Sequence, residues 1–221
     1  DISLIVENTF IRNLKISLLS FTKDIYTGFS KFYRPLQIIS YAFVYKIFKL
    51  KPIGYHLLNI FFHSGCGVLI YFLLKNIYGK KISFLTGLLW AIHPVNTEAI
   101  TYISGTADPS FLFFGLLGIY FYNISTDYSY FSKKEKNNIQ ITDLSFEKRK
   151  KRKKHLFFTL SLLCFIFSLI SKETAVLFLP LFFLYLYSTD KFEKQNFKDY
   201  FIVIFIFLIY LIFRQIFLNH S

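Results

Sequence analysis

Long apolar blocks, separated by short charged or polar breaks, are the feature that most constrains what this chain can fold into. Hydrophobic residues make up 54% of the 221 residues, and 30 Phe and 16 Tyr supply much of that share. Apolar residues of soluble domains recur as stripes, whereas blocks of this kind are typical of helices that cross a membrane. We therefore predict an all-α fold, a polytopic transmembrane helix bundle. The expected spans are 53–74, 82–94, 109–122, 156–170, 174–187 and 200–218.

The lengths of these blocks indicate how they cross the membrane. A span needs about 20 apolar residues for ~30 Å of hydrocarbon, and 53–74 and 200–218 meet this requirement. The blocks 156–170 and 174–187 are each short, yet joined as one helix they would be about 45 Å long, too long without severe tilt. The Ser-Lys-Glu break at 171–173 therefore predicts a hairpin of two short helices.

The segments between the blocks complete the expected organisation. An apolar stripe at helical spacing near the N-terminus suits helices that lie in the membrane interface. It consists of Phe10, Ile11, Leu14, Leu18 and Leu19. Pro35 predicts the start of a further helix over 36–50. The predicted order begins with an external loop over 1–52 that carries amphipathic interfacial helices, followed by three transmembrane helices over 53–122 with an external motif loop at 93–108. A basic cytoplasmic loop over 123–155, with a short helix near 143–153, comes next. Three transmembrane helices over 156–221 complete the chain.

The net charge of +13 is concentrated between the spans. Seven consecutive basic residues, 148–154, lie between two apolar blocks, which is where a cytoplasmic loop carries its positive charge. The same rule assigns 75–81, 123–155 and 190–198 to the cytoplasm and 1–52, 93–108 and 171–173 to the far side. The basic residues of 1–52 run against it; a loop that handles a phosphate-bearing lipid, or a tolerated exception, would explain them. No aromatic-interleaved basic motif is present, so we expect membrane lipids and no nucleic acid as partners.

On this topology the acidic outliers of the apolar part of the chain all fall on the far side. They are Asp1, Glu7, Glu98, Asp108 and Glu173. Charges near membrane depth are costly and usually functional. The sequence therefore predicts one polar site on the far side, of which the stretch 93–110 forms one wall.

Two polar patterns in or next to this wall allow a structural as well as a functional interpretation. Asp108 precedes Pro109, a pairing that predicts a helix N-cap and the first helical residue. His56, Asn59 and His63 share one face of the first span. Hydrogen bonds between helices are the favoured interpretation of that face, and contact with a substrate is the alternative.

Several segments, taken in order, resemble one family. DISLIVENTFIRNL, YRPLQIISYAF, HLLNIFFH, HPVNTEAITYISGTADPS and SKETAVLFLPL resemble the N-terminal membrane half of the GT-C superfamily. The resemblance is closest to the transmembrane-and-TPR-repeat O-mannosyltransferase type and its bacterial relatives. It implies a GT-C-like bundle with a transmembrane helix upstream and TPR repeats downstream, in a multi-pass integral protein that we place in the bacterial inner membrane.

The resemblance also implies an activity. It implies a glycosyltransferase that moves a sugar from a polyprenyl-phosphate-linked donor to a hydroxyl of a protein or glycan acceptor on the non-cytoplasmic face. Asp1 matches the second member of the Asp-Asp pair that supplies the family's expected base. Thr106 stands where the family commonly carries Arg, which removes one expected contact to the donor phosphate. The alternative is an inactive polytopic scaffold, or a transporter subunit, that carries C-terminal TPR repeats.

Transfer to a hydroxyl needs a carboxylate that accepts the proton, and the leaving lipid phosphate needs positive charge nearby. Asp1 and Asp108 are the candidate catalytic residues. The candidate substrate-binding residues are Arg34, His93, Glu98, Lys172 and Glu173, of which Arg34 and Lys172 suit a phosphate clamp. Lys172 could instead pair with Glu173 or extend to the interface. No metal site is assigned; a divalent-cation cofactor would use Asp1 and Glu98.

Overall fold

The computed structural model describes residues 2–21, 33–138, 144–189 and 197–220. Within these ranges every regular element is helical and no strand occurs, which confirms the predicted all-α class. The α-helices are α1 (Leu14–Ser17), α2 (Pro35–Phe48), α3 (Pro52–Ile92), α4 (Thr97–Thr101), α5 (Ala107–Asn138), α6 (Leu144–Ser171), α7 (Phe178–Ser188) and α8 (Phe197–His220). A π-helical turn, η1 (Ile2–Val6), precedes the 3-10 helices η2 (Thr9–Arg12), η3 (Leu18–Phe21), η4 (Pro94–Asn96), η5 (Ile103–Thr106) and η6 (Glu173–Leu177).

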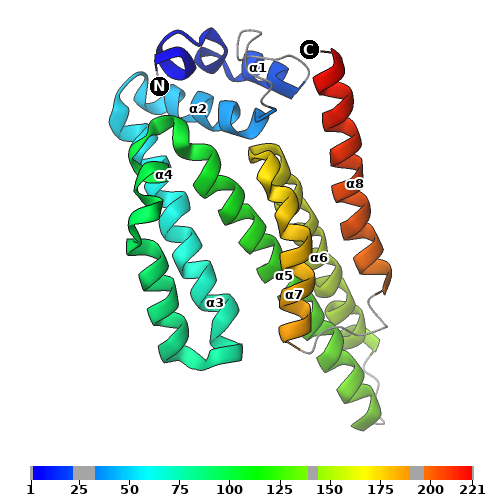
Figure 1. Cartoon of the computed structure of the whole chain (residues 1–221). Coiled ribbons are helices and arrows are strands. Elements are labelled where there is room, and N and C mark those ends of the chain that lie inside the picture. The colour runs from blue at the N-terminus through cyan, green and yellow to red at the C-terminus, as the bar shows by residue number, and fades with distance from the viewer. Residues whose placement is uncertain (1, 22–32, 139–143, 190–196, 221) are drawn as a thin grey trace.

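α3 is a hairpin of two antiparallel arms (Figure 1). Gly79 has a φ of 78°, which L side chains rarely adopt, and the chain reverses there. The arms approach closely, because a Cβ on Gly87 would lie 2.7 Å from the carbonyl oxygen of Gly67. His63 of the first arm donates from Nε2 to the carbonyl of Ala91 in the second (2.9 Å). α3 therefore makes the return that the sequence predicts within 75–81.

In the part of the chain that the structure describes, three helices are long and apolar enough to cross a membrane, judged by length and composition. They are α3, residues 148–171 of α6 and residues 197–216 of α8. A shorter apolar helical stretch covers 173–188. Large apolar side chains such as Leu89 and Phe205 remain exposed on the outer faces of these helices, which suits contact with lipid rather than water. These features support the predicted transmembrane helix bundle.

The hairpin predicted around 171–173 is present. α6 ends at Ser171, Lys172 has an extended backbone (φ −157°, ψ 142°), and η6 then leads into α7. The ring of Phe165 in α6 packs edge-on against Phe182 of α7 and Phe207 of α8, with centroids 5.7 Å and 5.8 Å apart. All three rings are buried, so aromatic packing joins α6, α7 and α8 in one core.

The basic segment expected as a loop over 123–155 is instead helical on both sides of 139–143. α5 continues to Asn138, and α6 begins at Leu144, so the short helix expected near 143–153 is the start of α6. Lys, Arg and Glu are good helix formers, and a helix that leaves the apolar region can continue with such residues exposed. The segment therefore differs from a loop because charge alone does not end a helix.

The N-terminal stripe expected to face the membrane interface is divided between two faces. Ile11 is fully buried in a small apolar cluster with residues of α2, whereas Leu18 and Leu19 are exposed. α2 starts at Pro35, as the sequence predicts, and runs across one end of the bundle (Figure 1). The N-terminal segment therefore packs on α2 through part of the stripe and leaves the rest uncovered.

The two ends of the bundle differ in character. At one end, here called the motif end, lie α2, the stretch 93–106 and the break 171–173, together with the C-terminal end of α8 (Figure 1). At the other, here called the basic end, lie the turn between the two arms of α3 and the basic start of α6. There Lys154 forms an ion pair with Asp199 (3.6 Å). The segments that the sequence assigns to one side are thus neighbours at one end.

Candidate functional site

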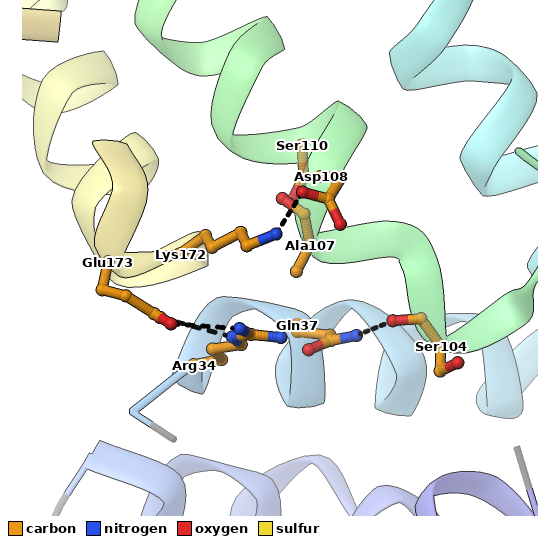
Figure 2. A network of polar contacts seen from close by, with 8 residues as sticks. All are labelled: Arg34, Gln37, Ser104, Ala107, Asp108, Ser110, Lys172 and Glu173. Atoms are coloured by element: carbon orange, nitrogen blue, oxygen red, sulfur yellow. Dashed lines mark hydrogen bonds and ion pairs between the residues drawn. The ribbon is translucent and has the colours of Figure 1, made fainter. Parts of the chain in front are cut away.

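Four of the predicted site residues meet at the motif end in two ion pairs (Figure 2). The Arg34 guanidinium donates two hydrogen bonds to the Glu173 carboxylate, from Nη2 to Oε1 (3.2 Å) and from Nε to Oε2 (3.5 Å). Nζ of Lys172 donates to Oδ1 of Asp108. The two neighbours Lys172 and Glu173 thus bind in different directions, one to the start of α5 and one to the residue before α2.

This geometry excludes two of the structural alternatives that the sequence allowed. Lys172 pairs with Asp108, not with its neighbour Glu173. Asp108 does not cap α5, because η5 runs directly into that helix and α5 begins one residue earlier, at Ala107. The carboxylate instead lies in the first turn, where the helix dipole favours a negative charge, and its side chain is 44% exposed. Asp108 is therefore available to a ligand at the motif end.

The charges of this cluster are partly withdrawn from solvent. The side chains of Arg34, Lys172 and Glu173 are 17%, 20% and 25% exposed. Burial raises the pKa of the Glu173 carboxyl, but hydrogen bonds from Arg34 and the backbone, with the charges of Arg34 and Arg214, outweigh it and lower the pKa below its ordinary value. The Glu173 carboxylate is therefore held ionised.

This shift predicts a pH dependence of stability. Because the folded pKa of Glu173 is lowered, its contribution is fully present above the ordinary carboxyl value of 4.5 and is lost as the pH falls through the folded pKa. Thermal unfolding in detergent between pH 7 and pH 3 should show wild type above Glu173→Gln at neutral pH, and the two converging in acid. A gap that widens in acid would contradict this sign.

The motif stretch is held in place by buried side chains of α2 and α3. Asn59 is fully buried; its Nδ2 donates to the carbonyls of Tyr102 (2.8 Å) and Ile100 (3.4 Å), and its Oδ1 accepts from Thr106. From α2, Nε2 of Gln37 donates to the carbonyl of Ser104 (2.8 Å), as Figure 2 shows. The hydroxyl of Tyr41, also in α2, donates to the carbonyl of Ile103 (2.7 Å). The Asn59 and His63 contacts agree with the structural interpretation of the polar stripe.

Asn59→Leu is expected to destabilise the protein by about 2–3 kcal/mol, because carbonyls of the motif stretch lose their buried donor. The measurement is the thermal unfolding midpoint in detergent, combined with protease cleavage within 97–106. The control is Ser64→Ala on the same helix, where an exposed hydroxyl bonds only to its own helix backbone. Equal midpoints and equal cleavage in both variants would show that Asn59 does not brace the stretch.

His93 and Glu98 are not part of the ion-pair cluster. His93 is exposed, and its Nδ1 accepts from the backbone N–H of Val95 (3.2 Å), which caps η4. Glu98 is exposed on α4. Asp1 lies outside the described residues. Among those that are described, no three His, Cys, Asp or Glu side chains gather to hold a metal ion, and the divalent-cation cofactor stays a prediction.

Three contributors to this region were not predicted from the sequence. Gln37 and Tyr41 lie on the buried face of α2, where an apolar run gives little sign that they hold carbonyls of another segment. Arg214 lies near the C-terminal end of α8 and acts electrostatically on Glu173. An arginine inside an apolar block was the available signal, because a charge at such a position usually has a function.

The chain is 40% identical over 78 residues to protein O-mannosyl-transferase TMTC3 of Homo sapiens and 38% identical over 98 residues to protein O-mannosyl-transferase tmtc2 of Xenopus laevis. It is 30% identical over 129 residues to protein O-mannosyl-transferase F38B6.6 of Caenorhabditis elegans. The chain is similar to protein O-mannosyl-transferases. The resemblance predicted from its motifs is confirmed.

The extent of the similarity is limited. The three matches cover 35%, 44% and 54% of this chain, and 8%, 12% and 19% of the length of these relatives. No protein-family model matches the chain. No solved structure matches it either. The apolar helices and these relatives support a membrane protein. All three relatives are animal proteins, so they give no support to the expected bacterial inner membrane.

Proposed function

We propose that this chain is part of a membrane glycosyltransferase that transfers a sugar from a polyprenyl-phosphate-linked donor to a hydroxyl of a protein acceptor. The relatives' names make mannose the first sugar to test. The observation that carries the proposal is the convergence of Arg34, Asp108, Lys172 and Glu173 at the motif end, from three segments far apart in the sequence. Charges collected at the end of an apolar bundle suit a donor with an apolar chain and an anionic phosphate.

Sugar transfer to a hydroxyl requires a base for the hydroxyl proton and a positively charged group for the leaving phosphate. A carboxylate accepts the proton of the acceptor hydroxyl as the glycosidic bond forms, and the anionic lipid phosphate leaves with the electron pair of the broken bond. Asp1 is the proposed base, and Asp108 is the second candidate. Lys172 and Arg34 are the proposed phosphate contacts: each exchanges part of its present carboxylate pairing for the phosphate, whose charge develops during transfer.

The positive-inside rule orients the bundle. The basic end carries residues 148–154 and Lys75, Lys80 and Lys81 of α3, so it is the proposed cytoplasmic end. The motif end then faces away from the cytoplasm, in the compartment where the acceptor receives the sugar. Protease access to a tag placed near Gly79 in sealed vesicles tests this orientation.

The proposal is tested with the full-length protein in isolated membranes supplied with radiolabelled polyprenyl-phosphate mannose. Label that appears in protein, and depends on the expressed chain, supports the transferase. The alternative is an inactive scaffold. Thr106 favours it in one respect, because this residue is fully buried and its hydroxyl is bonded to Asn59, so it does not replace the phosphate contact expected of an Arg at this position. Absence of label above the background of empty membranes would support that alternative.

A further inference from the structure

The inner face of α8 ends in two polar groups that no described residue satisfies. Val203, Phe207 and Tyr210 follow one another at helical spacing and are buried, and Arg214 continues this face one turn further as a half-buried residue. The hydroxyl of Tyr210 is buried without a hydrogen-bond partner. Within the described ranges, Arg214 forms no ion pair or hydrogen bond at contact distance. An unsatisfied buried hydroxyl beside a cation needs a partner from elsewhere.

Packing places these groups beside the ion pairs of the motif end. The ring of Phe213 contacts that of Tyr33 edge-on, with centroids 5.7 Å apart, and Tyr33 directly precedes Arg34. The Tyr210 ring belongs to the same buried cluster as Tyr33 and Ala175, which follows Glu173 by two residues. The Tyr210 hydroxyl also interacts electrostatically with Arg34, Glu173 and Arg214. The C-terminal part of α8 therefore packs beside Tyr33 and the residues that follow Glu173.

Among the described residues, the ion pairs at this place leave one positive charge without a contact-distance partner. Arg34 is matched by Glu173 and Lys172 by Asp108, which leaves Arg214 as a third cation whose nearby carboxylate, Glu173, already pairs with Arg34. A guanidinium and a hydroxyl donor are the groups that bind a phosphate oxygen well, and Arg is suited to such an anion in a partly dry site. A phosphate offers several acceptor oxygens, enough for a guanidinium and a phenol hydroxyl to donate at the same time.

We propose that Arg214 and Tyr210 bind a phosphate group at the motif end, with Arg34 on the other side of the anion, and that α8 thereby supplies part of the donor site. The inference rests on the proposed function in its choice of a lipid-linked phosphate as ligand. It adds to it a binding element from the last helix, one turn long, that defines where the phosphate lies between α2, η6 and α8.

The test measures binding of a polyprenyl monophosphate, without sugar, to the purified full-length protein in nanodiscs by native mass spectrometry. Arg214→Gln should weaken binding by about tenfold or more, since a charge-assisted contact is lost, and Tyr210→Phe by a smaller factor. The control is Lys198→Gln, an exposed cation at the opposite end of the same helix, which should bind as wild type does. Tyr210→Phe removes one hydroxyl and retains the packing, so it remains informative if Arg214→Gln misfolds.

The outcomes separate the two proposals. If both α8 variants bind the lipid as tightly as wild type, the α8 site is overturned while the transferase proposal stands. If wild type does not bind the lipid phosphate, the α8 site and the proposed donor class both fail. If millimolar inorganic phosphate displaces the lipid from wild type but not from Arg214→Gln, the same anion site exists and free phosphate is a ligand of it. If inorganic phosphate does not displace the lipid from wild type, the lipid is the source of the bound phosphate.

Discussion

Lys172→Ala in the full-length protein is expected to reduce transfer from a polyprenyl-phosphate sugar by at least about 100-fold, the loss found when one preorganised charge-stabilising group is removed. Membrane insertion should be unaffected, because Lys172 lies in the break after α6 and not within its apolar span. In the proposed reaction its ammonium group both positions Asp108 and neutralises the leaving phosphate. The measurement is kcat/KM for the lipid-linked donor, at equal amounts of folded protein.

The chain offers a matched control for this prediction. Lys154 is likewise a lysine paired with an aspartate, with a side chain 25% exposed against 20% for Lys172, but it lies in α6 at the basic end. Lys154→Ala should therefore transfer at close to the wild-type rate. An equal loss in both variants would indicate a general effect of breaking a lysine–aspartate ion pair, and full activity of Lys172→Ala would remove Lys172 from the site.

Asp1→Asn in the full-length protein is expected to lower the transfer rate by about 10²–10⁴-fold, because the amide cannot accept the proton of the acceptor hydroxyl. Binding of the donor should change little, so the loss should appear in kcat and not in KM. The control is Glu7→Gln, an exposed acid in the same N-terminal segment, for which wild-type kinetics are expected.

The same assay distinguishes the two candidate bases. If Asp1→Asn retains the wild-type rate while Asp108→Asn loses it, the base is Asp108 and the ion pair with Lys172 is the means of holding it. If both Asp1→Asn and Lys172→Ala retain the wild-type rate, the motif end is not a site of transfer, and the scaffold alternative gains support.

The arrangement of the helices was largely predictable from the sequence, because the breaks between apolar blocks are sharp. Gly79 and the Ser-Lys-Glu break each fall where the chain reverses. The neighbourhood of 93–108 and 171–173 followed from counting passes, since segments separated by an even number of spans return to the same end. Ion pairs between Arg34 and Glu173 and between Lys172 and Asp108 agree with that count.

The contacts within the site were less predictable, because they depend on side-chain directions at the ends of helices. Sequence spacing made Glu173 a possible partner of Lys172, but the extended backbone at Lys172 sends neighbouring side chains to different helices. The Pro109 that follows Asp108 predicted an N-cap at Asp108. The 3-10 helix η5 instead runs directly into α5, so Asp108 lies inside the first turn and does not cap the helix. Arg214 lies far from the motifs in sequence, and only packing of α8 beside Tyr33 reveals its proximity.

The most direct test is a structure of the full-length protein with a polyprenyl phosphate bound, which shows which end of the bundle holds the phosphate. The expected position is the motif end, within hydrogen-bond distance of Arg34 or Lys172 and with the lipid chain along the exposed apolar faces of the helices. A phosphate bound instead at the basic end, on the lysines and arginines of 148–154, would contradict a transfer site at the motif end.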